Sequence, residues 1–129
     1  MRTRCEYRGN QLAIELLVLD NEASPVADFL GQLTEQERGK VDVLFERLGN
    51  QGRISNKELF KKIEGTKLFE FKRHQIRLIC FYTSNKRVVI CHALRKKQDK
   101  HQKRDLDRAE KLRTDYLNQA ETGNDHERQ

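Results

Sequence analysis

Residues 68–97, LFEFKRHQIRLICFYTSNKRVVICHALRKK, decide the fold, because polar and apolar side chains alternate along them as they do in β-strands. The alternation predicts three consecutive antiparallel strands at about residues 67–73, 76–83 and 87–94. Tight turns at His74-Gln75 and Asn85-Lys86 would join them. With two-residue loops, Lys72 lies opposite Arg77 in the first hairpin and Ile79 lies opposite His92 in the second.

This pairing assigns every strand residue to one of two faces, because successive strand side chains point to opposite sides. We expect the first face to pack under helices; it carries Phe69, Phe71, Leu78, Cys80, Tyr82, Val89, Cys91 and Ala93. We expect the second face to meet solvent; it carries Glu70, Lys72, Arg77, Ile79, Phe81, Ile90, His92, Leu94 and Lys96. Five ionisable side chains therefore converge at one end of the second face. Cross-strand ion pairing of Glu70 on a solvated surface would explain part of this set equally well.

The residues before this stretch predict one strand and two helices. Residues 1–10 are polar, and we expect them to be frayed, whereas Leu12 to Leu19 form an apolar run typical of a buried strand. Ser24-Pro25 predicts a capped helix start. Thr34-x-x-Glu37 is a capping box that opens a second helix, which Gly49 is expected to end. The two helices are predicted to form a hairpin.

Two further helical segments are predicted on either side of the sheet region. A second Ser-x-x-Glu pattern, Ser55 to Glu58, predicts a short helix that ends at Gly65. Helical periodicity returns after Gln102, so a C-terminal helix is expected. Residues 121–129 are polar and are expected to be disordered. The fold class is thus α+β, an antiparallel-rich sheet packed on an N-terminal helical hairpin with a C-terminal helix, in one domain over 1–129 with a folded core of about 12–120.

Composition narrows the function classes. The 129 residues carry a net charge of +6 at a pI near 9.4, so a polyanion is the expected partner. No apolar stretch approaches the roughly 18–20 residues that span a bilayer. The three cysteines are an odd number without a short-spaced metal-ligand pair, which favours a reducing compartment and therefore the cytoplasm. A pairing of Cys80 with Cys91 is conceivable, but two small buried side chains are the better interpretation.

The charge is concentrated in residues 95–104, RKKQDKHQKR, where six basic residues and one acidic residue give +5 of the chain's +6. A basic run of this kind is often only the solvated start of a helix. Here it leaves the sheet at the end where Lys72, Arg77 and His92 converge, and this placement favours a basic groove for phosphates.

The order of these motifs carries a family resemblance. Leu68-Phe69-Glu70-Phe71-Lys72, then Ile76-Arg77, then His92-x-x-x-Lys96-Lys97 and finally Lys103-Arg104-x-x-x-x-Ala109 follow a helical pair. This series resembles the RelE/HigB toxin superfamily, and most nearly its phage-derived, HigB-like branch. The resemblance covers about residues 12–117. It implies the toxin of a type II toxin–antitoxin system, an mRNA endoribonuclease that attacks phosphate with the RNA 2′-hydroxyl, needs no metal or other cofactor, and acts on the ribosome.

The resemblance also implies roles for residues and partners. It places Arg77 as the phosphate stabiliser, Lys72 or Lys96 as the proton-transfer group, and Lys97 on the RNA backbone. The wider RNA-binding set would add further residues: Arg73, His92, Arg95, Lys100 and His101. The expected partners are mRNA, the ribosome and a cognate antitoxin, most naturally a helix-turn-helix protein, and no membrane is expected. A non-catalytic protein that binds RNA or only the antitoxin through the same face is the alternative.

Overall fold

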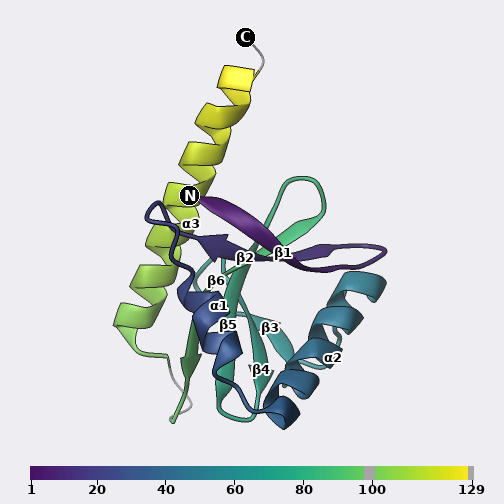
Figure 1. Ribbon diagram of the computed structural model, residues 1–129. Coiled ribbons are helices and arrows are strands. Elements are labelled where there is room, and N and C mark those ends of the chain that lie inside the picture. The colour runs from purple at the N-terminus through teal and green to yellow at the C-terminus, as the bar shows by residue number, and fades with distance from the viewer. Residues whose placement is uncertain (98–100, 128–129) are drawn as a thin grey trace.

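Six strands form one mixed sheet in the computed structural model, which describes residues 1–97 and 101–127 (Figure 1). The strand order is β1-β2-β6-β5-β4-β3. The strands are β1 (Arg2–Arg8), β2 (Ala13–Val18), β3 (Phe60–Lys62), β4 (Phe69–Arg73), β5 (Ile76–Thr83) and β6 (Arg87–Arg95), and the helices are α1 (Pro25–Gly31), α2 (Glu35–Gln51) and α3 (Lys103–Glu127). Among the strands of the described residues, only β2 and β6 pair in parallel, so the α+β class and the antiparallel-rich character of the sheet are confirmed.

The N-terminal residues correct the first expectation. Residues 2–8 are not frayed but form β1, an edge strand antiparallel to β2. The sequence of residues 2–8 does not reveal this strand, because most of its side chains are exposed or half-buried and therefore polar. Pairing with a fully buried neighbour supplies the stability that β1 lacks alone, because every residue of β2 is buried.

The predicted helix starts are confirmed. The Ser24 hydroxyl accepts a hydrogen bond from the amide of Ala27, and Pro25 opens α1. Both halves of the capping box are formed at the start of α2: the Thr34 hydroxyl accepts from the Glu37 amide, and the Glu37 carboxylate accepts from the Thr34 amide. Both helices make their main contacts with strands rather than with each other, so they are two helices on one sheet face and not a packed hairpin.

The end of α2 was placed too early. The helix continues through Gly49 to Gln51, and Gly52 caps it in the left-handed region at a φ of 80°. Gly49 serves close packing instead, since a Cβ there would lie 2.9 Å from the Tyr7 ring. Residues 55–65 are not helical either: the Asn56 side chain accepts from the Glu58 amide in a turn, and β3 follows.

The first hairpin of the sheet has the predicted register, with Lys72 opposite Arg77 and Glu70 opposite Ile79. The second hairpin has the predicted register only at the end away from its loop. Ile79 lies opposite His92 as expected, but the register shifts by one residue between Ile79 and Cys80. The loop at its tip therefore has three residues, 84–86, and Cys91 is the extra residue of a β-bulge.

The bulge reverses the face of three predicted residues. Ile90 packs with the α1 and α2 side of the sheet, whereas Val89 and Cys91 face α3. Cys91 and His92 were expected to point to opposite faces. Both instead approach α3, through Cys91 Sγ to the Ala109 carbonyl and His92 Nε2 to Asp105. Cys80 lies opposite Ile90 and not opposite Cys91.

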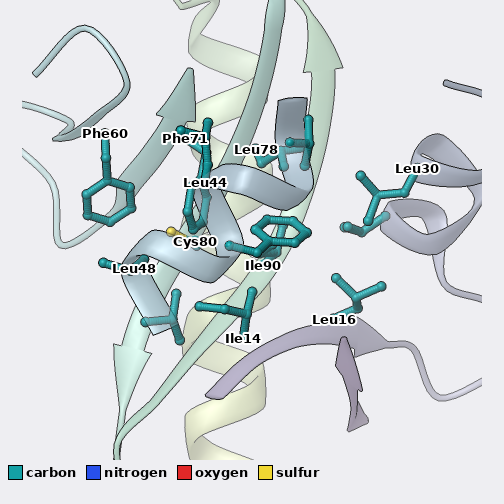
Figure 2. Close-up of a cluster of buried hydrophobic side chains, with 14 of the residues drawn as sticks. Ile14, Leu16, Leu30, Leu44, Leu48, Phe60, Phe71, Leu78, Cys80 and Ile90 are labelled. Atoms are coloured by element: carbon teal, nitrogen blue, oxygen red, sulfur yellow. The ribbon is translucent and has the colours of Figure 1, made fainter. Parts of the chain in front are cut away.

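Both faces of the sheet are covered. One core lies beneath α1 and α2, where Leu44, Phe71 and Leu78 are buried together (Figure 2). Phe45 of α2 meets the Phe71 ring edge-on in this core. A second core lies beneath α3, where Ile79, Phe81 and Leu68 are buried against Ala109 and Leu112. The face that we expected to meet solvent is therefore mostly a second core, because α3 lies across it. At its polar end, Lys72, Arg77 and Lys96 are half-buried.

Candidate functional site

A buried histidine–carboxylate pair lies at the polar end of this second face. Glu70 of β4 is 1% exposed, and its carboxylate hydrogen-bonds to Nε2 of His101, whose side chain is 7% exposed. His101 lies two residues before the start of α3, so the contact ties the entry of that helix to the sheet. Nδ1 of His101 is buried and has no hydrogen-bond partner in the described part of the chain. An imidazole held at one nitrogen and unsatisfied at the other is oriented for a further polar group.

Three cations surround this pair, as the predicted register requires. Lys72 and Arg77 lie opposite each other on β4 and β5, and neither forms an ion pair with any described residue. The Lys96 amide donates to the Gln75 carbonyl at 2.6 Å, which fixes the segment after β6 beside the β4–β5 turn. The site therefore sits where β4 turns into β5 and where β6 ends, at the lower end of the sheet in Figure 1.

The electrostatics of Lys96 reflect this crowding. Burial lowers the pKa of its ammonium group below the usual value of 10.5, and the charges of Arg77, Lys61 and Lys72 lower it further. The Glu70 carboxylate acts in the opposite direction and raises the same pKa. Lys96 is thus a cation among cations with one buried carboxylate nearby, an arrangement that favours an added anion.

A pocket of about 310 Å³ opens beside the pair and the end of β6. Of the predicted residues, Arg95, Lys96, Lys97 and His101 line it, together with Arg104 and Asp105 of α3. Asp105 accepts a hydrogen bond from His92 Nε2 at 2.9 Å, so a second histidine–carboxylate pair adjoins the first. His92 keeps the face that the predicted register gave it, because the pairing of Ile79 with His92 lies beyond the bulge at Cys91.

Not every predicted residue joins the cluster. Arg73 follows the strand alternation onto the opposite face from Lys72. The Arg95 guanidinium donates two hydrogen bonds to Glu37 of α2, at 2.8 and 2.9 Å, and lies over the Phe29 ring. Lys97 is exposed at the rim of the pocket. Lys100 lies outside the described residues.

The guanidinium of Arg77 points back along its own turn. Its Nη1 donates to the carbonyls of His74 and Ile76, at 2.5 and 2.8 Å. Its Nε is buried without a partner among the described residues. His74 holds its backbone in the left-handed region at a φ of 52°, which brings its carbonyl within reach.

Sequence reasoning underestimated two residues. Glu70 was weighed as a surface partner of the neighbouring cations, yet it is buried and pairs with His101. Asp105 was missed altogether. Its signal was available in the sequence, because an acidic residue in the first turn of a helix after a basic run is well placed to meet a nearby histidine.

The described part of the chain contains no group of three histidine, cysteine, aspartate or glutamate side chains close enough to hold a metal ion. In the same residues, no helix is both long and apolar enough to cross a membrane.

The sheet, its three flanking helices and the basic end next to α3 fit the class that the motif order suggested, the RelE/HigB toxin-like group. Residues 28–114, about two thirds of the chain, match the family described as phage derived protein Gp49-like (DUF891). The chain belongs to this Gp49-like family, which is part of the RelE/HigB toxin-like group. No curated protein sequence matches the chain significantly.

Proposed function

We propose that this Gp49-like protein is the endoribonuclease toxin of a type II toxin–antitoxin pair, and that it cleaves mRNA on the ribosome in the cytoplasm. The observation that carries the proposal is the convergence of Lys72, Arg77 and Lys96 around the buried Glu70–His101 pair. Family membership supports it, and it supports a cognate antitoxin as well. We expect that antitoxin to be a helix-turn-helix protein.

The chemistry suits an RNA substrate. In the proposed step the 2′-oxygen forms a bond to the adjacent phosphorus and the 5′-oxygen leaves, which gives a 2′,3′-cyclic phosphate and a 5′-hydroxyl. One group removes the 2′-hydroxyl proton and another protonates the leaving oxygen. The non-bridging oxygens gain negative charge on the way, so guanidinium and ammonium groups next to them stabilise the transition state more than the ground state.

The geometry supports a division of roles. Arg77 would stabilise the phosphate, and Lys97 at the pocket rim would hold the RNA backbone. Lys72 or Lys96 would transfer a proton. His101 is a third candidate for proton transfer, because Glu70 holds one of its nitrogens and leaves the other unsatisfied.

The test uses two substitutions of Arg77 and one substitution of an exposed control arginine. Arg77→Ala should lower RNA cleavage by about 10²–10³-fold and abolish growth arrest on induction. Arg77→Lys should recover little, because an ammonium group lacks the planar fork of a guanidinium. Arg47→Ala, on the exposed side of α2, is the matched control and should behave as the unmodified protein. Thermal melting of each variant controls for folding.

Two results would count against the proposal. Full toxicity of a folded Arg77→Ala protein would move the catalytic centre towards the Lys96-Lys97 segment. Normal growth and intact transcripts at high expression of the unmodified protein would favour the non-catalytic alternative, in which the same basic face binds RNA or the antitoxin without cleavage. Adding ribosomes to the purified protein and mRNA tests the ribosome requirement separately.

A further inference from the structure

A second basic surface lies away from the candidate site, on the α2 side of the sheet. A groove of about 380 Å³ runs between the segment after α2 and the strands β3, β4 and β5. We call it the aromatic groove; its principal lining residues are Arg53, Lys57, Phe60, Lys62, Phe69 and Tyr82. The candidate site uses none of these side chains.

The floor of the aromatic groove is a row of three rings. Phe60 and Phe69 are stacked with their planes 8° apart and their centroids 5.8 Å apart. Phe69 then meets Tyr82 edge-on, at 4.9 Å and 83°. Tyr82 is 38% exposed, although it ends a row whose other members are mostly covered. An exposed ring fixed by its neighbours presents a flat face at little entropic cost.

The walls of the aromatic groove are positive. Arg53, Lys57, Lys61 and Lys62 line it, and no carboxylate is among its lining residues. None of these four cations forms an ion pair within the described residues. An apolar floor with uncompensated cations around it favours a ligand that has both flat rings and negative charge.

We propose that the aromatic groove binds single-stranded RNA outside the cleaved segment, with a base stacked on Tyr82 and adjacent phosphates held by Lys57 and Lys62. Alternating rings and cations are the pattern by which proteins hold single strands without reading their sequence. The proposal deepens the proposed function and rests on it for the identity of the nucleic acid.

The edge strand β3 connects this groove to the candidate site. Its neighbouring lysines point to opposite faces, as in any strand. Lys61 lines the groove and is also close enough to Lys96 to lower the pKa of that ammonium group, whereas Lys62 lines the groove and has no such effect on Lys96. Because β3 is the last strand of the sheet, a flexible chain can pass around it from one face to the other. The groove then holds RNA in place while a distant phosphate lies among the catalytic cations.

The test measures binding without cleavage. A fluorescein-labelled 12-nucleotide RNA with 2′-O-methyl groups cannot undergo 2′-hydroxyl attack, so its anisotropy reports binding to the full chain alone. Tyr82→Ala should weaken binding by about 5- to 100-fold, the range for loss of one stacked base. Tyr82→Phe should bind the RNA as tightly as the unmodified protein does, because the ring and not the hydroxyl makes the stacking contact. Lys62→Ala should reduce the slope of log affinity against log salt by about 0.7.

Val43→Ala is the matched control, because Val43 is the other large apolar side chain exposed among the described residues and lies on α2 away from the groove. It should leave binding unchanged. A photo-crosslink from 4-thiouridine in the RNA to the peptide containing Tyr82 should appear in the unmodified protein and vanish in Tyr82→Ala. Thermal melting shows whether loss of the Phe69 contact has affected folding.

The outcomes separate this inference from the proposed function. Unchanged binding by folded Tyr82→Ala and Lys62→Ala proteins, alongside normal RNA cleavage, overturns the groove and leaves the ribonuclease standing. Binding through Tyr82 in a protein that cleaves no RNA supports the groove and overturns the ribonuclease. Loss of neutralisation by the antitoxin in Tyr82→Ala, with RNA binding intact, assigns the groove to the protein partner and overturns the inference.

Discussion

The Glu70–His101 pair provides a test that separates stability from activity. Glu70→Ala removes a fully buried carboxylate and leaves the buried His101 without its partner. Breaking a buried pair in this way costs about 3–5 kcal/mol of the free energy of unfolding. For a chain of 129 residues, an unfolding entropy of about 2.1 cal/mol/K per residue converts this loss into a Tm lower by about 10–20 °C.

Replacing both partners should give the opposite result. Glu70→Leu combined with His101→Leu exchanges the pair for apolar side chains that can pack with the adjacent core, and such exchanges are typically neutral or stabilising. We therefore expect the double variant to melt within a few degrees of the unmodified protein and yet to cleave no RNA. Such a result would mean that the Glu70–His101 pair is needed for RNA cleavage and not for stability.

Urea unfolding and RNA cleavage of the single and double variants check this. Glu15→Ala is the control, because Glu15 is the other buried carboxylate among the residues whose burial is described, and it pairs with Arg87 at 3.0 Å, away from the site. Glu15→Ala should lose stability but retain cleavage below its Tm. A double variant as unstable as Glu70→Ala, or one that is folded and fully active, would refute the reasoning.

Three shorter predictions concern the rest of the fold. The Arg95 hydrogen bond lowers the pKa of Glu37 from 4.5 to about 2, so the stability that the ionised Glu37 contributes is complete above pH 4.5 and is lost as the pH falls towards 2. Glu37→Gln keeps the helix cap but should make stability less dependent on pH between 4.5 and 2, which the urea midpoint measured at each pH would show. Gly9→Ala places a Cβ 2.1 Å from the α2 backbone and should destabilise the protein by about 1–3 kcal/mol in urea unfolding. The control Gly39→Ala adds a Cβ on α2 with no atom within 4 Å and should stabilise the protein by about 0.5–1 kcal/mol. Only Cys5 is an exposed thiol, so an aromatic disulfide reagent should label one thiol quickly in the native protein and three after unfolding; burial raises the pKa of both other thiols and protects them.

Local chemistry explains what the sequence predicts well. The caps at Ser24 and Thr34 and the His74-Gln75 turn depend on neighbouring residues, and the structure confirms them. The register of the first hairpin follows from its loop length alone. It brings Lys72, Arg77 and Glu70 to one end of one face, which is why much of the candidate cluster could be predicted.

The features that the sequence did not predict depend on residues far apart in the chain. β1 forms because β2 is a buried neighbour, and no pattern within residues 2–8 reveals that. The loop before β6 has three residues, of which Asn85 and Lys86 both adopt positive φ. The extra loop residue reverses the faces of the β6 residues between the loop and the bulge at Cys91. The burial of Glu70 needs α3 to cross the sheet, and only the tertiary structure shows that crossing.

The parallel pairing of β2 with β6 delays completion of the sheet. Residues 13–16 of β2 find their partners at residues 87–90 of β6, so more than seventy residues must be synthesised between the two halves of that contact. Until β6 emerges, a fully buried strand has one unpaired edge, and the face that will carry the cations lacks its third strand and the helix that covers it. An incomplete chain therefore cannot assemble the basic end of the sheet. The proposed activity would therefore begin only after β6 and α3 have been synthesised.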